Sequence, residues 1–321
     1  MLGYCTYSVE KALIMLKRTS ILLLTSVLLL AATCERDVDL GFDDPDPRLV
    51  VFSNFSNGGD IHVQVSKSTP VLDNTAEEYI SDAKVEIYGS GQLIERLRLV
   101  IPTSSRFPPY YTTRGLVPEI NVDYMIKVEA DGFETVRAES TIPEQVKVIF
   151  FEVSELVIKE DESERTYSYR VRMGFDDPED EANFYHLNIY QQIQDYIGGL
   201  GDTVITGTTY RAIEFSPKNN TNDLVAYLGG GLLLEDDPLH GDYDFNLSVS
   251  IDPSHQILGK VFVEFRTVSE DYYLYHSSIT RQNYSEGGSF SEPVFVYNNI
   301  ENGHGVFAGF NTSVDSVLLI Q

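Results

Sequence analysis

Cys34 is the residue of this chain whose position most clearly indicates a covalent modification. A thiol at the first position after a cleaved leader can receive a diacylglyceryl group. The preceding segment fits such a leader: it has Lys17 and Arg18, then an apolar run from Ile21 to Leu30, then small residues. That run has about half the twenty or so apolar residues that span a bilayer. We therefore expect residues 1–33 to be a lipoprotein signal peptide, with lipidation at Cys34.

The alternative is an ordinary secretory signal with an incidental cysteine, because Thr33 stands where Gly, Ala or Ser is usual. A complete signal begins at Met15, so we predict that as the true start, and Cys5 would precede it. The mature chain would then keep only the lipidated Cys34. A disulfide, a thiolate metal site and a cysteine nucleophile each need thiols that it does not offer.

The chain is strongly acidic, with 49 acidic and 23 basic residues and a formal charge of −26. Nucleic acid is therefore not an expected partner, because phosphate binding requires a basic face. Charge would not hold the chain on an anionic membrane either, so attachment would depend on the lipid at Cys34. Acidic residues also dominate the predicted tether, residues 34–47. Its Glu35, Asp37 and Asp39 resemble the surface-export signal of Bacteroidetes lipoproteins, although a solvated tether would look the same.

Alternating apolar and polar residues recur along the rest of the chain and predict half-buried antiparallel strands. Examples are Ile61-Val63-Val65, Tyr124-Ile126-Val128 and Val261-Val263-Phe265. Many short strands separated by turn residues are typical of a sandwich or barrel, so we predict an all-β fold. We expect an immunoglobulin-like β-sandwich over residues 48–143 and a second, larger β domain over residues 144–321.

One segment of the second half predicts a helix instead. Thr267 and Glu270 have the spacing of a capping box, and a helical run follows to about Asn283. We therefore predict a short helix over about 269–283. On this helix the residues expected to share one face are Tyr272, Tyr275, Ile279 and Gln282.

Several segments together resemble the DUF4249 family of Bacteroidetes outer-membrane lipoproteins. They are Leu49-Val50-Val51, Asp82–Val85, Leu116–Pro118, Phe175–Pro178, Asn183–Tyr185, Glu235–Gly241, Glu292–Val294 and Asn298–Phe307. The positions that carry the family motifs, without a known role, are Asp177, Pro178, Asn183, Tyr185, Asp237, Gly241, Pro293, Asn299, Gly303, Gly305 and Phe307. The resemblance implies a cell-envelope lipoprotein, often encoded beside a TonB-dependent outer-membrane receptor. It implies no established activity.

A search for catalytic and ligand-binding patterns finds little. The zinc-protease, phosphate-loop and nucleophile-elbow motifs are absent from the sequence, and its six histidines show no ligand spacing. Acidic clusters occur at 176–181 and 235–244; each could hold calcium or be a solvated loop, and no other cofactor is indicated. With 20 Tyr and 17 Phe, the chain is rich in side chains that suit binding interfaces, although core packing explains them equally well.

These observations favour a non-catalytic, lipid-anchored protein of the outer membrane that faces the cell exterior. We expect it to be an accessory or ligand-capture partner of a TonB-dependent transporter in nutrient uptake, with an unknown ligand. An adhesin or structural envelope lipoprotein is the alternative, and a lipid-anchored hydrolase is the second alternative.

Overall fold

The computed structural model describes residues 46–70, 75–104, 106–178, 182–198, 203–213, 215, 224–226, 230–236, 243–285 and 294–319. The predicted signal peptide lies outside the described residues, as do Cys34 and the acidic residues that follow it. The chain from Asp46 onward forms one compact unit. Its described part contains 17 strands and one helix, which confirms the all-β prediction.

The first half of the unit is a sandwich of two antiparallel sheets. Its strands are β1 (Leu49–Ser56), β2 (His62–Lys67), β3 (Lys84–Gly89), β4 (Gln92–Arg96), β5 (Arg98–Val100), β6 (Tyr110–Thr112), β7 (Tyr124–Glu129) and β8 (Val136–Ser140). One sheet has the order β4-β3-β7-β8, and it faces the order β1-β2-β6-β5. Buried alternate residues such as Val51, Val63 and Ile126 fill the space between them, as the sequence pattern predicted.

The second half is a larger sandwich. Its strands are β9 (Val148–Glu160), β10 (Arg165–Phe175), β11 (Phe184–Ile197), β12 (Val204–Ala212), β13 (Leu224–Ala226), β14 (Leu232–Glu235), β15 (Tyr243–Ile251), β16 (Gln256–Val268) and β17 (His304–Leu318). A sheet of order β15-β10-β9 packs on the sheet that contains β11 and β16. Their shared core includes Val171, Tyr185, Phe245 and Phe265.

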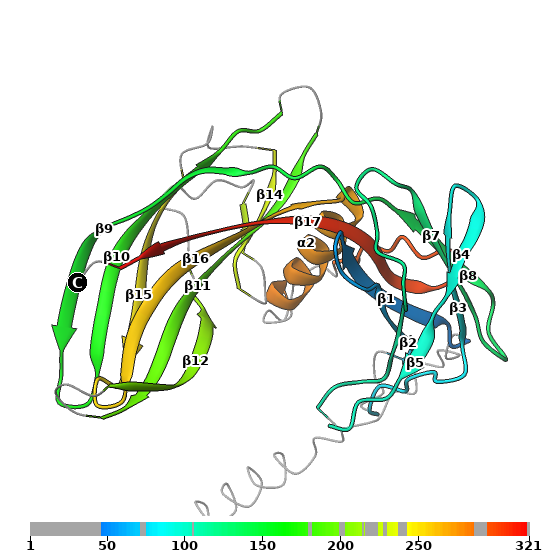
Figure 1. The fold of residues 1–321 in the computed structure, drawn as a ribbon. Coiled ribbons are helices and arrows are strands. Elements are labelled where there is room, and N and C mark those ends of the chain that lie inside the picture. The colour runs from blue at the N-terminus through cyan, green and yellow to red at the C-terminus, as the bar shows by residue number, and fades with distance from the viewer. Residues whose placement is uncertain are drawn as a thin grey trace, which may run out of the picture. The chain divides into compact units, whose positions relative to one another are not determined.

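Strand β17 belongs to both halves. Its first residues pair in parallel with β1, from Val50 opposite His304 to Ser56 opposite Phe310. Its remaining residues pair antiparallel with β16 as far as Lys260 opposite Leu318. Figure 1 shows β17 as the red strand that runs from β1 along β16. One sheet therefore continues through both sandwiches, and Phe307 of β17 lies in the core of the first. Within this single compact unit, the core of the first half contains residues up to Ile142 together with Ile300 and Phe307, and the core of the second half contains residues from Phe151 to Leu319.

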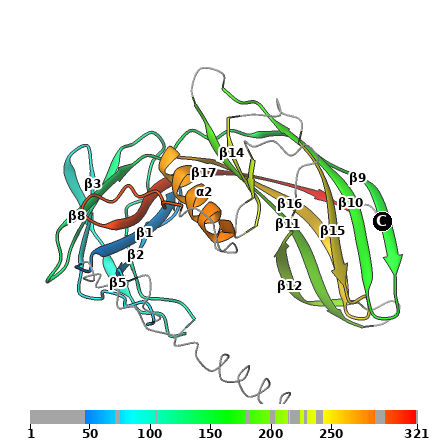
Figure 2. The ribbon, with the colours of Figure 1, turned by 180° about the vertical axis from the view of Figure 1, so that it is seen from behind.

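The helix α2 (Glu270–Ser285) covers the sheet where the two halves join. Figure 2 shows it beside β17, and its Tyr272 and Tyr273 pack with Phe52 of β1 and Phe184 of β11. The predicted helix is confirmed, but two details were wrong. Thr267 is the penultimate residue of β16, and the hydroxyl of Ser269 accepts the Tyr272 N–H instead, at 3.4 Å. Among residues 270–283 of the helix, those that are buried are Tyr272, Tyr273, His276, Ser277 and Thr280, because α2 meets a sheet rather than a narrow groove.

Candidate functional site

Four of the family-motif positions meet in the connection from β10 to β11. The hydroxyl of Tyr185 donates to Asp177 Oδ1, and the ring of Tyr185 is buried in the core. The side-chain amide of Asn183 donates to the Pro178 carbonyl at 3.1 Å, and its backbone N–H donates to Asp236 Oδ1 at 2.8 Å. These contacts fix where β11 begins, so the residues position the strand rather than a ligand.

The C-terminal motif has the same kind of role. Asn299 Oδ1 accepts the Phe307 N–H at 3.0 Å, and Asn299 Nδ2 donates to the Phe307 carbonyl at 2.9 Å. One side chain thus satisfies both backbone groups of a residue in the part of β17 that does not pair with β16. Gly303 and Gly305 allow β1 to approach, because a Cβ on Gly305 would lie 2.0 Å from the Val51 oxygen. The remaining motif positions, Asp237, Gly241 and Pro293, lie outside the described residues.

A buried polar network lies between α2 and the sheet. The Tyr272 hydroxyl lies 2.9 Å from His186 Nδ1 and accepts an N–H of Arg266 at 3.2 Å. His276, one turn further along α2, has its Nε2 3.0 Å from the side-chain amide nitrogen of Asn54 on β1. Assigning the Tyr272 proton to His186, and an Asn54 proton to His276, satisfies these contacts with both imidazoles neutral.

The network continues along the outer face of the sheet. Arg266 donates to Glu264 Oε1 through two nitrogens, at 3.0 and 2.8 Å, and its guanidinium lies 4.8 Å from the centre of the Phe310 ring. The Tyr190 hydroxyl donates to the other oxygen of Glu264 at 3.1 Å. Burial and the neighbouring carboxylate raise the pKa of Tyr190, so its hydroxyl remains a donor. Hydrogen bonds therefore link the helix interface to a more exposed part of the same face.

Both buried histidines resist protonation. Burial, assisted by the charge of Arg266, lowers the pKa of His186 to about 3 and that of His276 to about 4. An unfolded chain would protonate the same rings near their ordinary pKa of 6.5. Below that value the unfolded state binds more protons than the folded state, so acid destabilises the fold.

We therefore expect stability to be constant with respect to these groups above pH 6.5 and to fall as the pH decreases from 6.5 toward 4. The slope should be about 1.4 kcal/mol per pH unit for each histidine. Urea unfolding followed by circular dichroism between pH 7 and pH 5 measures it, above the range in which most carboxylates titrate. His276→Gln should remove about half of the slope. An unchanged slope would contradict the assignment.

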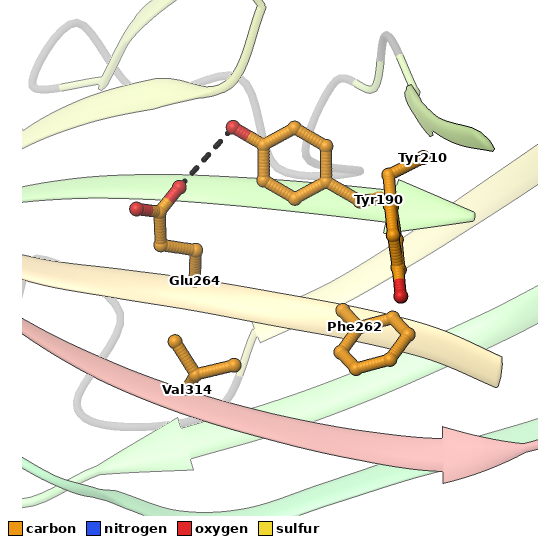
Figure 3. A pocket seen from close by; sticks show the side chains of 5 residues that line it. All are labelled: Tyr190, Tyr210, Phe262, Glu264 and Val314. Carbon is orange, nitrogen blue, oxygen red and sulfur yellow. Dashed lines mark hydrogen bonds between the residues drawn. The ribbon is translucent and has the colours of Figure 1, made fainter. Parts of the chain in front are cut away.

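An aromatic hollow of about 260 Å³ lies at the exposed end of the network. Figure 3 shows its five lining residues, which come from four adjacent strands: Tyr210 of β12, Tyr190 of β11, Phe262 and Glu264 of β16, and Val314 of β17. The rings of Tyr210 and Phe262 meet edge to face, with centroids 5.4 Å apart. Tyr210 is 58% exposed and Val314 61%, so the hollow is open to solvent.

The face around the hollow is unusual for so acidic a chain. The strand segments around the hollow are residues 190–194, 208–212, 260–266 and 312–318. In these segments strand alternation places Lys260, Glu264 and Arg266 on the face of the hollow. Arg211 and Asp315 lie on the opposite face of the sheet. Two positive charges and one negative charge give this face a formal charge of +1, against −26 for the whole chain. Leu318, which is 58% exposed, extends its apolar surface.

The structure does not assemble the other predicted sites in its described part. Of the two acidic clusters, Asp177 and Asp236 bond to Tyr185 and Asn183, while 179–181 and 237–242 lie outside the described residues. Within the described ranges no three His, Cys, Asp or Glu side chains gather as a metal site would require. Helices in the same ranges include none with both the length and the apolar character needed to cross a membrane.

The sequence analysis missed the network and the hollow. His186 and His276 are 90 positions apart, and both contact Tyr272 only because α2 folds back onto β11. The hollow requires the register that sets Tyr190 opposite Phe262 and Glu264 opposite Val314. A signal existed in β16 itself, because alternation with the buried Val261 and Val263 places the apolar Phe262 on the face that is predicted to be exposed.

Fold and site together define an all-β protein of two sandwiches that share one strand, with an open aromatic hollow on the outer face of the larger one. The model of the family described as "Domain of unknown function (DUF4249)" matches residues 35–316, and the chain belongs to this family. No curated protein matches the chain.

Proposed function

We propose that this chain is a non-catalytic binding protein, anchored by lipid at Cys34 to the outer membrane and displayed outside the cell. In this proposal it is an accessory, ligand-capture partner of a TonB-dependent transporter. The leader sequence, the acidic residues after Cys34 and the resemblance stated above support the location and the partner. The observation that carries a binding role is the open aromatic hollow.

The hollow has the properties of a recognition surface. Its volume of about 260 Å³ exceeds the 150 Å³ or so that accommodates one benzene ring in an apolar cavity. Tyr and Phe rings provide contact area with little loss of side-chain entropy. Glu264 is already paired with Arg266 and Tyr190, so a ligand would not have to desolvate an isolated charge. We therefore assign to the hollow an apolar or ring-shaped group of the captured ligand.

Affinity purification of the tagged full-length lipoprotein from solubilised outer membranes tests the partner. We expect stoichiometric recovery of a TonB-dependent receptor, and a reduced yield from Cys34→Ala, which cannot be anchored. Recovery of the correctly anchored lipoprotein alone would contradict a stable complex and would bring the adhesin and hydrolase alternatives forward.

Native mass spectrometry of the same preparation tests the hollow. We expect a bound compound on the wild-type protein and its loss from a Tyr210→Ser, Val314→Ser double variant. Both side chains are largely exposed, so the fold should be unaffected. The matched control is Ile101→Ser, which removes an apolar side chain that is 68% exposed on the other sandwich. Equal occupancy in the double variant and the control would place ligand capture elsewhere.

A further inference from the structure

We infer that the loop between β5 and β6 inserts into the lipid surface to which the chain is anchored. The described residues of this loop are 101–104 and 106–109. Its two large exposed apolar side chains, Ile101 and Phe107, are 68% and 66% exposed, and we call them the apolar tip. Single exposed apolar side chains are common on proteins, so exposure alone does not identify a partner. The inference depends on where the loop lies, on its charge and on its order.

Strand register places the apolar tip at the end of the sheet where the described chain begins. Leu49, the first residue of β1, lies opposite Lys67, the last residue of β2. Strand β6 pairs antiparallel with β2, with its last residue, Thr112, opposite the first residue of β2. The start of β6 is therefore directed toward Lys67. The end of β5 pairs with the start of β6, so the loop that joins them lies at the same end as Leu49 and Asp46.

The tether is short enough to hold this end near the lipid. Residues 35–45, eleven in all, separate Cys34 from Asp46, where the described chain begins. A fully extended chain advances at most about 3.6 Å per residue, so Asp46 lies within roughly 40 Å of the lipid on Cys34. The apolar tip, at the same end of the sheet, is therefore held close to the membrane. This inference rests on the lipid anchor of the proposed function and adds a second contact with the same membrane.

The loop and its flanks contain no carboxylate, in contrast to the rest of this acidic chain. From Leu97 to Pro118 the sequence has three arginines and no Asp or Glu, although 49 of the 321 residues are acidic. Arg106, beside Phe107, is exposed and has no ion-pair partner among the described residues, so its guanidinium is available to lipid phosphate. Strand β9 also exposes apolar side chains, but it carries three glutamates. The tether is acidic, so apolar contact rather than charge would provide most of the attachment.

Local contacts keep the loop in one shape. The Phe107 N–H donates to the Ser104 carbonyl at 3.2 Å, which closes a turn. The next two residues are both proline, whose ring fixes the backbone angle φ. The Tyr110 ring then packs against His62 of β2, with ring centroids 4.8 Å apart. These restraints reduce the conformational entropy that is lost when the apolar tip enters the lipid.

Tryptophan fluorescence of the full-length lipoprotein in vesicles tests the insertion, because the chain contains no Trp. The vesicles consist of phosphatidylethanolamine and phosphatidylglycerol, with a phosphatidylcholine that is brominated on its acyl chain. In Phe107→Trp we expect the indole to lie roughly 5–10 Å into the boundary between headgroups and acyl chains. Its emission should be blue-shifted and quenched by bromine, and high salt should leave the quenching in place. The matched control is Val157→Trp, at a β9 position that is 52% exposed, and it should be quenched several-fold less.

Flotation of the same vesicles separates this inference from the lipid anchor. Lipoprotein that floats with the vesicles, while Phe107→Trp is quenched no more than Val157→Trp, would overturn the insertion and leave the anchor intact. Blue-shifted emission that bromine does not quench would show that protein rather than lipid covers the apolar tip, and would also overturn it. Lipoprotein that does not float would contradict the anchor itself, and the insertion would fall with it.

Discussion

Gly305→Ala is expected to be the most damaging glycine-to-alanine change among the glycines that the structure describes. Gly305 lies opposite Val51, where β17 and β1 join the two sandwiches, and has φ of +110°. A Cβ there would lie 2.0 Å from the Val51 oxygen and 2.9 Å from the Val51 carbonyl carbon. These are backbone atoms, so relief requires the strands to separate. We expect a loss of more than about 4 kcal/mol, a large part of the 5–15 kcal/mol that stabilises an ordinary domain.

Urea unfolding followed by circular dichroism measures this loss. Gly58→Ala is the matched control, because Gly58 also has a positive φ, +82°, but a Cβ on it would meet nothing within 4 Å. It should cost only the 1–2 kcal/mol or so that a left-handed conformation imposes on a residue with a Cβ. Equal losses for the two variants would mean that backbone conformation alone, and not the approach of Val51, requires glycine at position 305.

Arg266→Met is expected to have the second-largest effect. The Arg266 guanidinium is mostly buried. It donates hydrogen bonds to the Glu264 carboxylate and the Tyr272 hydroxyl, and it lies over the Phe310 ring. Methionine would fill much of the same space but would leave the Glu264 carboxylate, which is 19% exposed, with Tyr190 alone. Removing one member of a buried ion pair costs about 3–5 kcal/mol, and the partial exposure here reduces that to about 2–4 kcal/mol.

A double-mutant cycle separates the ion pair from simple loss of volume. Glu264→Gln should restore part of the stability of Arg266→Met, because the amide need not be charged. The interaction free energy should lie between about 1 and 3 kcal/mol. Because Tyr272 belongs to α2, hydrogen exchange should also show faster opening of the helix in Arg266→Met. Additive losses in the cycle would show that the two side chains stabilise the fold independently.

The fold could largely be read from the sequence wherever one face of a strand is buried. Alternation predicted strands such as Tyr124–Glu129, because every second side chain of a half-buried strand faces the core and is apolar. The helix was predicted by its departure from that period. Its contact face was wrong, because periodicity on one element does not specify the shape of its neighbour. The flat sheet buries Tyr273, His276 and Thr280 together with Tyr272, a wider band than the predicted stripe.

The family-motif positions show the same division. Asn299 and Gly305 stood out in the sequence, but only the structure distinguishes folding from docking as their role. Asn299 satisfies the backbone of Phe307, and Gly305 permits the contact with Val51. The explanation for Gly305 requires a parallel pairing between β1 and β17, about 250 positions apart. Parallel pairing over such a distance has no local sequence signature, because no turn connects the two strands.

By itself the sequence determined the fold class, the acidic net charge that makes nucleic acid an unexpected partner, and the expectation of a lipid anchor at Cys34. Each of these depends on composition or on residues close together in the chain. The tertiary structure alone decided that one strand joins both sandwiches, that His186 and His276 share a buried network, and that Tyr190, Tyr210 and Phe262 line one hollow. The physical reason is that long-range register places these side chains together, and register follows from packing of the whole sheet.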